Sequence, residues 1–175
     1  TMVASSITLP STIMTYFDTT ASPANPHNRG FSFYVYGTYP LHGIKLVARL
    51  LHRDTYDEIV LIGRALSGVA DLITVILVFC IGARLTKYYE AGLLAALCYA
   101  LAVVPIQLSH FFTVDPYVTL FITIALWHIL RGRIGFFTGV AIGLAISAKI
   151  SAILILPVLF LCLISLWPWR GNTPA

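Results

Sequence analysis

The feature that most constrains this chain is a series of long apolar runs that begins after Ile59 and is interrupted by few charged residues. Hydrophobic residues make up 58% of the sequence and charged residues 10%, whereas soluble domains contain roughly 45–50% and 25%. We therefore expect an all-α polytopic membrane protein. The runs predict about five transmembrane helices, at roughly 62–83, 91–112, 116–130, 135–148 and 150–167, within a bundle that covers residues 59–170 and is followed by a tail at 171–175.

The first 58 residues differ from the rest, because prolines, Ser, Thr and Asn interrupt them and no apolar run reaches spanning length. We expect an outer, partly helical segment on the membrane surface. Within it, PLHGIKLVARLLHR at 40–53 predicts a short interfacial helix that begins at Pro40. His42, Lys45, Arg49 and Arg53 share one face of this helix, opposite an apolar face. Such a helix either lies at a bilayer surface or packs on protein, and the sequence leaves both readings open.

Basic residues predict how the chain lies in the membrane. If the spans alternate, one side collects Arg84, Lys87, Arg131, Arg133 and Arg170. The positive-inside rule makes that side cytoplasmic, so we expect a bacterial cytoplasmic membrane with residues 1–58 on the non-cytoplasmic side. The formal net charge of +4 is explained by basic residues at helix ends, and no nucleic-acid partner is expected.

Asp115 and Lys149 are the strongest candidates for a site. Sixteen residues separate Asp115 from Arg131, roughly 24 Å of helix, and fourteen separate Lys149 from Gly135, roughly 21 Å. Both are shorter than the roughly 30 Å hydrocarbon core, so the two charges are predicted at similar depth, in a polar pocket open to the outer side. There Lys149 could attract a phosphate, and Asp115 a divalent cation or a substrate hydroxyl. Alternatively, Asp115 caps the third span or pairs with Lys149.

Three further polar residues stand near or within the apolar runs. Arg64 and Asp71 lie on one face of the first predicted span, where they are interpreted as structural polar groups, Asp71 being satisfied by a neighbouring helix. His110 stands beside the Asp115 turn. It is a candidate for proton movement, or a hydrogen-bonded structural residue.

Several stretches in this order resemble a known family: YGTYPLHGIKLVARLLH, IGRALS, IGARLTKYYEAGLLAALCYAL, HFFTVDPYVTLFITIAL and GLAISAKISAILILP. They are similar to membrane glycosyltransferases of the GT-C fold, in particular the protein O-mannosyltransferase-like group (glycosyltransferase family 39) and the lipid A aminoarabinose transferases. The resemblance implies transfer of a sugar from a polyprenyl- or dolichyl-phosphate carrier, with inversion at the anomeric centre. It also implies that Asp115 lies near a metal or the acceptor and Lys149 near the lipid phosphate. Residues 36–40, with Tyr36 and Pro40, would border the donor site.

The sequence departs from that family at its principal catalytic acid. The family carries this acid in a His-Pro-Asp-Glu-like motif, which does not occur in this sequence, and the YFDTT context of Asp18 does not match it. Without a general base to activate the acceptor hydroxyl, we expect the chain as given to be incomplete and inactive. The alternative is a non-catalytic accessory subunit that packs against other membrane subunits, for example in a respiratory or photosynthetic electron-transfer complex.

Overall fold

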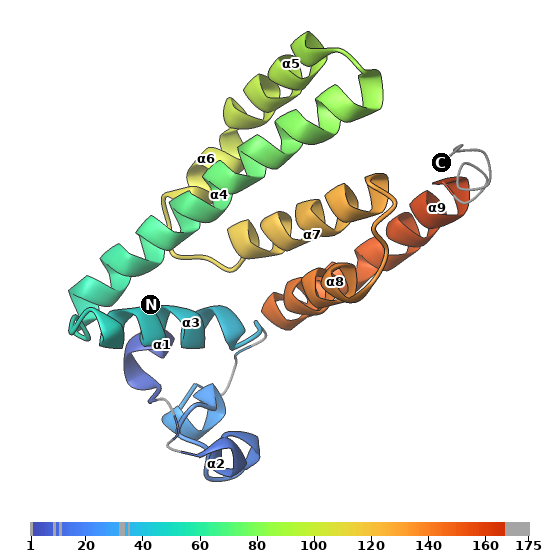
Figure 1. The fold of residues 1–175 in the computed structure, drawn as a ribbon. Coiled ribbons are helices and arrows are strands. Elements are labelled where there is room, and N and C mark those ends of the chain that lie inside the picture. The colour runs from blue at the N-terminus through green and yellow to red at the C-terminus, as the bar shows by residue number, and fades with distance from the viewer. Residues whose placement is uncertain (1, 9, 11, 32–33, 35, 167–175) are drawn as a thin grey trace.

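The computed structural model describes residues 2–8, 10, 12–31, 34 and 36–166, and these residues form helices and loops without a strand (Figure 1). The helices are α1 (Met2–Ser6), α2 (Ile13–Phe17), η1 (Pro26–Arg29), α3 (Tyr39–Leu50), α4 (Tyr56–Thr86), α5 (Tyr89–Ala100), α6 (Val103–Ser109), α7 (Asp115–Leu130), α8 (Phe136–Ala148), η2 (Ile150–Ile155) and α9 (Leu156–Leu166). The prediction of an all-α protein is confirmed for this part of the chain.

The longest helix is α4, whose 31 residues extend roughly 46 Å at a rise of about 1.5 Å per residue. A capping box starts it, in which the Thr55 hydroxyl donates to Glu58 Oε2 at 2.6 Å. Lys87, at a φ of 64°, ends it in the left-handed conformation. The helix contains the predicted span 62–83 and is long and apolar enough to cross a membrane.

The second predicted span, 91–112, is broken in the structure. It divides into α5 and α6, which meet at a bend of 61°. Pro105, in the first turn of α6, has no N–H with which to bond the carbonyl of Leu101, so one continuous helix would lose a hydrogen bond there. Gly92 lets α5 lie close to α4, since a Cβ at this position would come within 2.7 Å of the Phe79 carbonyl oxygen.

The remaining apolar helices are short. α7 has 16 residues and α8 has 13, roughly 24 Å and 20 Å of helix, and they pack together with α9 around Ala125, Ile129, Ala141 and Leu159. Within the described residues, one helix is long enough to cross a membrane, or two if the bent α5–α6 pair counts as one span. The prediction of five spans is therefore not confirmed. The end of the fifth predicted span, Arg170 and the 171–175 tail lie outside the described residues.

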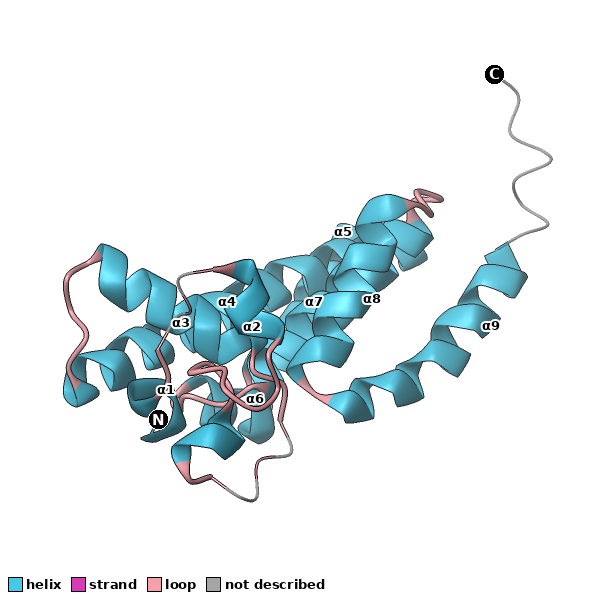
Figure 2. Ribbon diagram, turned by 90° about the horizontal axis from the view of Figure 1, so that it is seen from below, coloured by secondary structure: helices cyan, strands magenta, loops and turns pink. Residues whose placement is uncertain are grey.

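The N-terminal segment packs on the start of α4. α3 leads into the start of α4, where the two helices meet (Figure 1), and α1 joins them in a cluster that contains Ile7, Leu41, Ile44 and Ile59. A helix is thus present within the predicted range 40–53, as α3, and its apolar face packs on protein; its place at a membrane surface stays a prediction. One part of the predicted basic face is wrong: Lys45 is buried, 3% exposed. Figure 2 shows α9 extending away from the other helices.

Burial of Lys45 is explained by its partners. Its ammonium group lies 2.7 Å from Asp54 Oδ1 and donates to the Ser5 carbonyl at 3.3 Å. A buried charge is tolerated when it is paired and hydrogen-bonded. Lys45 therefore ties α3 to the α3–α4 turn and to α1, and does not face lipid headgroups.

Candidate functional site

Two chain segments meet at an ion pair between Asp115 and Lys149. Asp115 is the first residue of α7, and Lys149 follows the last residue of α8 in an extended conformation. Lys149 Nζ donates to Asp115 Oδ1 at 2.7 Å, and about a third of each side chain is exposed (33% and 32%). The sequence predicted that these charges share one level, and the structure brings them into contact. Of the two structural alternatives the pairing is observed, whereas the N-cap of α7 has no side-chain hydrogen bond.

Tyr36 borders the same lysine. The Lys149 ammonium lies 5.7 Å from the centre of the Tyr36 ring, within the range of a cation–π contact. The backbone beside Tyr36 is fixed to α8, because Gly37 N donates to the Ala148 carbonyl at 2.9 Å. A Cβ at Gly37 would overlap the Ser147 carbonyl oxygen, so only glycine permits this approach. We call residues 36–38 the anchored segment.

None of the described hydrogen bonds and ion pairs joins Pro40 to the pair, and Pro40 lines an apolar pocket. This pocket, of about 300 Å³, lies between α3, α4 and α7, and its wall includes Tyr39, Pro40, Leu66, Tyr117 and Phe121. The sequence pattern did not predict it, because part of its wall comes from α7, which is far from α3 and α4 in the sequence. The amphipathic pattern of α3 was the one available signal, because it shows that the apolar face of this helix must pack against another part of the protein.

Asp71 is satisfied within the helix bundle. The Tyr99 hydroxyl of α5 donates to Asp71 Oδ1 of α4 at 2.9 Å, so a neighbouring helix satisfies Asp71, while its purely structural role stays a prediction. A small cavity of about 90 Å³ lies beside this bond and is also lined by Pro105 and Thr119. Arg64 is exposed on α4, and the described contacts of Asp71 do not include it.

His110 follows the last residue of α6. Its ring Nδ1 lies 2.7 Å from the Ile106 carbonyl oxygen, and the side chain is exposed. The hydrogen bonds and ion pairs of the described residues do not join it to Asp115 or Lys149. This geometry matches the structural alternative for His110, and its part in proton movement stays a prediction.

The residues of the pair do not fit a divalent cation held by the protein. Asp115 already accepts from an ammonium group, and a second cation at the same carboxylate would be repelled by Lys149. The described residues contain no group of three or more His, Cys, Asp and Glu side chains that could surround a metal ion.

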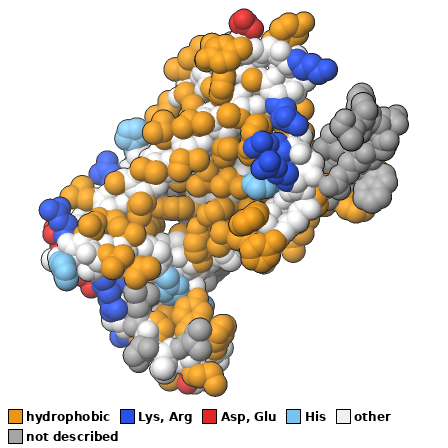
Figure 3. All heavy atoms as spheres, viewed as in Figure 1, with side chains coloured by type: hydrophobic (Ala, Val, Ile, Leu, Met, Phe, Trp, Pro, Cys, Tyr) orange, Lys and Arg blue, Asp and Glu red, His pale blue; other side chains and the backbone are white. Residues whose placement is uncertain are grey.

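Basic residues gather at the other end of the bundle. Arg84 Nε at the end of α4 donates to the Leu130 carbonyl at the end of α7, at 3.1 Å. The Arg131 guanidinium lies 5.2 Å from the centre of the Trp127 ring, and Figure 3 shows a cluster of Lys and Arg side chains on this face. The predicted collection of Arg84 and Arg131 at one end is therefore seen, while which side of a membrane they face stays a prediction.

Comparison with known proteins identifies the family. No curated protein and no solved structure gives a significant match to the chain. The family profile described as "Dolichyl-phosphate-mannose-protein mannosyltransferase" matches residues 44–173. The matched region covers well over half of the chain and includes Asp71, Asp115 and Lys149, whereas Tyr36 and Pro40 precede it. The chain, an all-α membrane protein, therefore belongs to the dolichyl-phosphate-mannose-protein mannosyltransferase family.

Proposed function

We propose that this chain is the membrane-embedded part of a GT-C-like glycosyltransferase that binds a polyprenyl-phosphate-linked sugar. The observation that supports this most directly is the Asp115–Lys149 pair beside Tyr36, at 2.7 Å and 5.7 Å from the lysine nitrogen. A lipid-linked sugar needs a cation for its phosphate, and Lys149 supplies one that is still partly exposed. The family match makes a lipid phosphate the expected anion.

Asp115 serves first to position the lysine. A free lysine side chain loses up to roughly 2 kcal/mol of rotamer entropy when it is fixed in one place. Asp115 and the Tyr36 ring fix Lys149 before the donor binds, so part of this entropy is already lost when the protein folds and does not weaken donor binding. When a phosphate approaches, the ammonium group has further donors to offer it, because it has three hydrogens.

The apolar polyprenyl chain of the donor can pack against an apolar surface of the protein. The apolar pocket begins at Tyr39 and Pro40, which directly follow the anchored segment in the sequence. Its wall is mostly aliphatic and aromatic, as suits an isoprenoid chain. In this arrangement Lys149 and Tyr36 bind the headgroup while Pro40 borders the lipid.

Transfer requires one more group. The acceptor hydroxyl must lose its proton as it attacks the anomeric carbon and the bond from that carbon to the phosphate oxygen breaks. The His-Pro-Asp-Glu-like motif that carries the family's principal acid is not in this sequence. We therefore propose donor binding, without transfer, for these residues alone, with Asp115 near the acceptor hydroxyl and His110 as a secondary candidate for the proton.

A test measures donor binding in lipid nanodiscs with a short-chain polyprenyl-phosphate mannose. Lys149→Gln removes a charged hydrogen bond of roughly 1.5–3 kcal/mol, so the Kd should rise about tenfold to a hundredfold. Asp115→Asn keeps the lysine but removes both the contact that positions it and the carboxylate that competes for it, so its Kd should change less than that of Lys149→Gln. Lys87→Gln, an exposed lysine after α4, is the matched control. Unchanged binding in Lys149→Gln would contradict the proposal.

The accessory-subunit alternative makes a different prediction. Its supporting observation is that Asp115 and Lys149 satisfy each other, as a purely structural pair would. If that is their whole role, each single neutral substitution lowers the unfolding temperature, and the double exchange Asp115→Lys/Lys149→Asp restores it without any effect on donor binding. If Lys149 binds phosphate, the double exchange restores stability but not affinity.

A further inference from the structure

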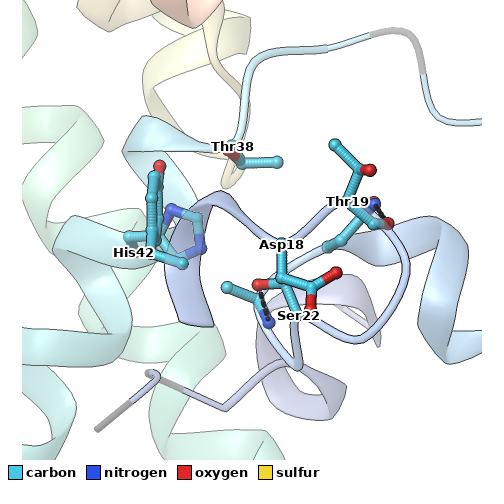
Figure 4. A pocket seen from close by; sticks show the side chains of 8 residues that line it. Asp18, Thr19, Ser22, Thr38 and His42 are labelled. Carbon is cyan, nitrogen blue, oxygen red and sulfur yellow. Dashed lines mark hydrogen bonds between the residues drawn. The ribbon is translucent and has the colours of Figure 1, made fainter. Parts of the chain in front are cut away.

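A second, polar pocket lies away from the ion pair. It has a volume of about 220 Å³ and is formed by the N-terminal segment against the start of α3 (Figure 4). His42 of α3 stands on one side, Asp18, Thr19 and Ser22 stand on the other, and Thr38 lies along the edge (Figure 4). The sequence pattern assigned no function to this group.

One carboxylate oxygen of Asp18 accepts hydrogen bonds within the protein, and the described hydrogen bonds leave the other for a ligand. Its Oδ1 accepts three hydrogen bonds, from Thr20 N at 2.9 Å, Thr20 Oγ1 at 2.8 Å and Ala21 N at 3.0 Å. These bonds, with the Thr20 hydroxyl first, lower the pKa of the Asp18 carboxyl, which therefore stays ionised near neutral pH. None of the described hydrogen bonds ends on Oδ2. A fixed carboxylate oxygen of this kind accepts well from a ligand hydroxyl.

The His42 ring lines the opposite side of the pocket. Both ring nitrogens are buried and make no hydrogen bond of ordinary geometry to the described residues. Burial lowers the pKa of His42, against a smaller opposing effect of the Ala24 backbone, so the ring is neutral near pH 7 and offers one donor and one acceptor. The Tyr16 ring packs edge-on against it, with the ring centres 5.4 Å apart.

The lining excludes several classes of ligand. It contains no Lys or Arg, so it does not suit an anion. It offers one carboxylate and one histidine, fewer than the three protein ligands of a typical catalytic zinc site. Hydroxyl, amide, carboxylate and imidazole groups are unsuited to a lipid chain. The volume is below the roughly 300–1,000 Å³ of pockets that hold drug-sized ligands.

We infer that this pocket binds a single neutral sugar ring through its hydroxyl groups. The Asp18 carboxylate accepts from one hydroxyl, the Thr19 hydroxyl exchanges hydrogen bonds with another, and the Tyr16 and His42 rings offer flat surfaces to the sugar C–H groups. All the residues that form it precede residue 44, where the family match begins. The pocket is therefore a feature of the segment outside that match.

The anchored segment connects this pocket to the phosphate site. Thr38 lines the pocket, and Tyr36, two residues earlier, contacts Lys149. Their Cα atoms are at most about 7.6 Å apart, because consecutive Cα atoms are about 3.8 Å apart. The identity of this sugar as the acceptor or the donor sugar rests on the proposed function, whereas the binding of a free sugar can be measured without it.

The test titrates methyl mannoside, methyl glucoside and methyl galactoside against the chain in nanodiscs, with binding followed by saturation-transfer NMR. At least one should bind with a millimolar Kd, and glucuronate, which is anionic, should bind more weakly. Asp18→Asn and Thr19→Val should each weaken binding, the first about tenfold. Asp57→Asn, an exposed carboxylate on α4, should not. The described hydrogen bonds do not involve the Thr19 side chain, so Thr19→Val should leave the local structure intact. It therefore tests the pocket even if Asp18→Asn disturbs the turn.

The two proposals fail separately. Asp18→Asn should leave the binding of sugar-free polyprenyl phosphate unchanged, and Lys149→Gln should leave methyl glycoside binding unchanged. Absence of binding by all three glycosides at about 50 mM (about a tenth of sites filled at a Kd of about 0.5 M), or binding unaffected by both pocket variants, overturns the sugar pocket. Neither result would affect the phosphate site.

Discussion

Gly37 is the residue on which the position of the anchored segment depends, and Gly37→Ala is the sharpest test of it. A methyl group at this position would overlap the Ser147 carbonyl oxygen and come within 3.0 Å of the Ala148 carbonyl carbon. The segment must then move away from α8, and the hydrogen bond from Gly37 N to the Ala148 carbonyl, 2.9 Å long, is lost or stretched.

The cost follows from these two effects. A lost backbone hydrogen bond is worth about 0.5–1.5 kcal/mol, and an added methyl in a packed position costs about 1–3 kcal/mol. Together they lower the free energy of local opening by about 2–4 kcal/mol. Since about 1.4 kcal/mol corresponds to a factor of ten, the open population of the segment rises about 30-fold at the lower value.

Chymotrypsin cleavage after Tyr34 or Tyr36 reports this opening, because a protease needs an opened segment and its rate follows the open population when reclosing is fast. Gly139→Ala is the matched control. Gly139 lies in α8, with open space where a Cβ would stand, and alanine should stabilise the helix by about 0.5–1 kcal/mol. If Gly37→Ala is cleaved no faster than Gly139→Ala, the close approach of the segment to α8 is wrong.

Three other perturbations follow from the described contacts. Tyr99→Phe, with Asp71→Asn as the second arm of a double-mutant cycle, should show a coupling of about 0.6–1.7 kcal/mol between α4 and α5, measured by unfolding in detergent; no coupling would show that the bond does not contribute. His42 has a lowered folded-state pKa, so the unfolded chain binds more protons between that pKa and about 6.5, and stability should fall as pH drops below about 6.5; His42→Phe should flatten this part of the pH profile. Lys45→Ala leaves Asp54 without its cation, and Lys45→Met should be the milder change because Lys45 is buried and the methionine chain replaces its packing; equal unfolding temperatures for the two variants would contradict this.

Residues that favour helix ends explain why the bounds of α7 and α8 were predicted to within about one residue. Asp115 and Pro116 begin α7, and Gly135 and Lys149 flank α8, all of them residues that favour helix ends. Pro105 carries the same kind of signal, but it stands inside a long apolar run, whose pattern favours one continuous span. The break between α5 and α6 shows that the missing N–H outweighed the apolar pattern at this point.

Of the ion-pair site, the sequence predicted only the similar depth of its two charges, which follows from helix length. The rise per residue placed Asp115 and Lys149 at one level, and their contact agrees. Nothing in the spacing brings Tyr36 to Lys149, since more than one hundred residues separate them and the expectation came from resemblance alone. The Asp18–His42 pocket combines three short stretches with no common pattern, and only their packing against α3 reveals it.

The family-matched region and the residues before it contribute different groups to the two proposed sites. The family-matched region supplies the cation, and the residues before it supply Tyr36, Gly37 and Thr38, which lie between the cation and the polar pocket. In the proposed arrangement, a change at Asp18 or Thr19 alters which sugar binds without altering Lys149, the proposed ligand of the phosphate. Because Gly37 joins the two parts through a backbone contact with no room for a side chain, a shift of α8 would move the anchored segment with it, and the two proposed sites would move together.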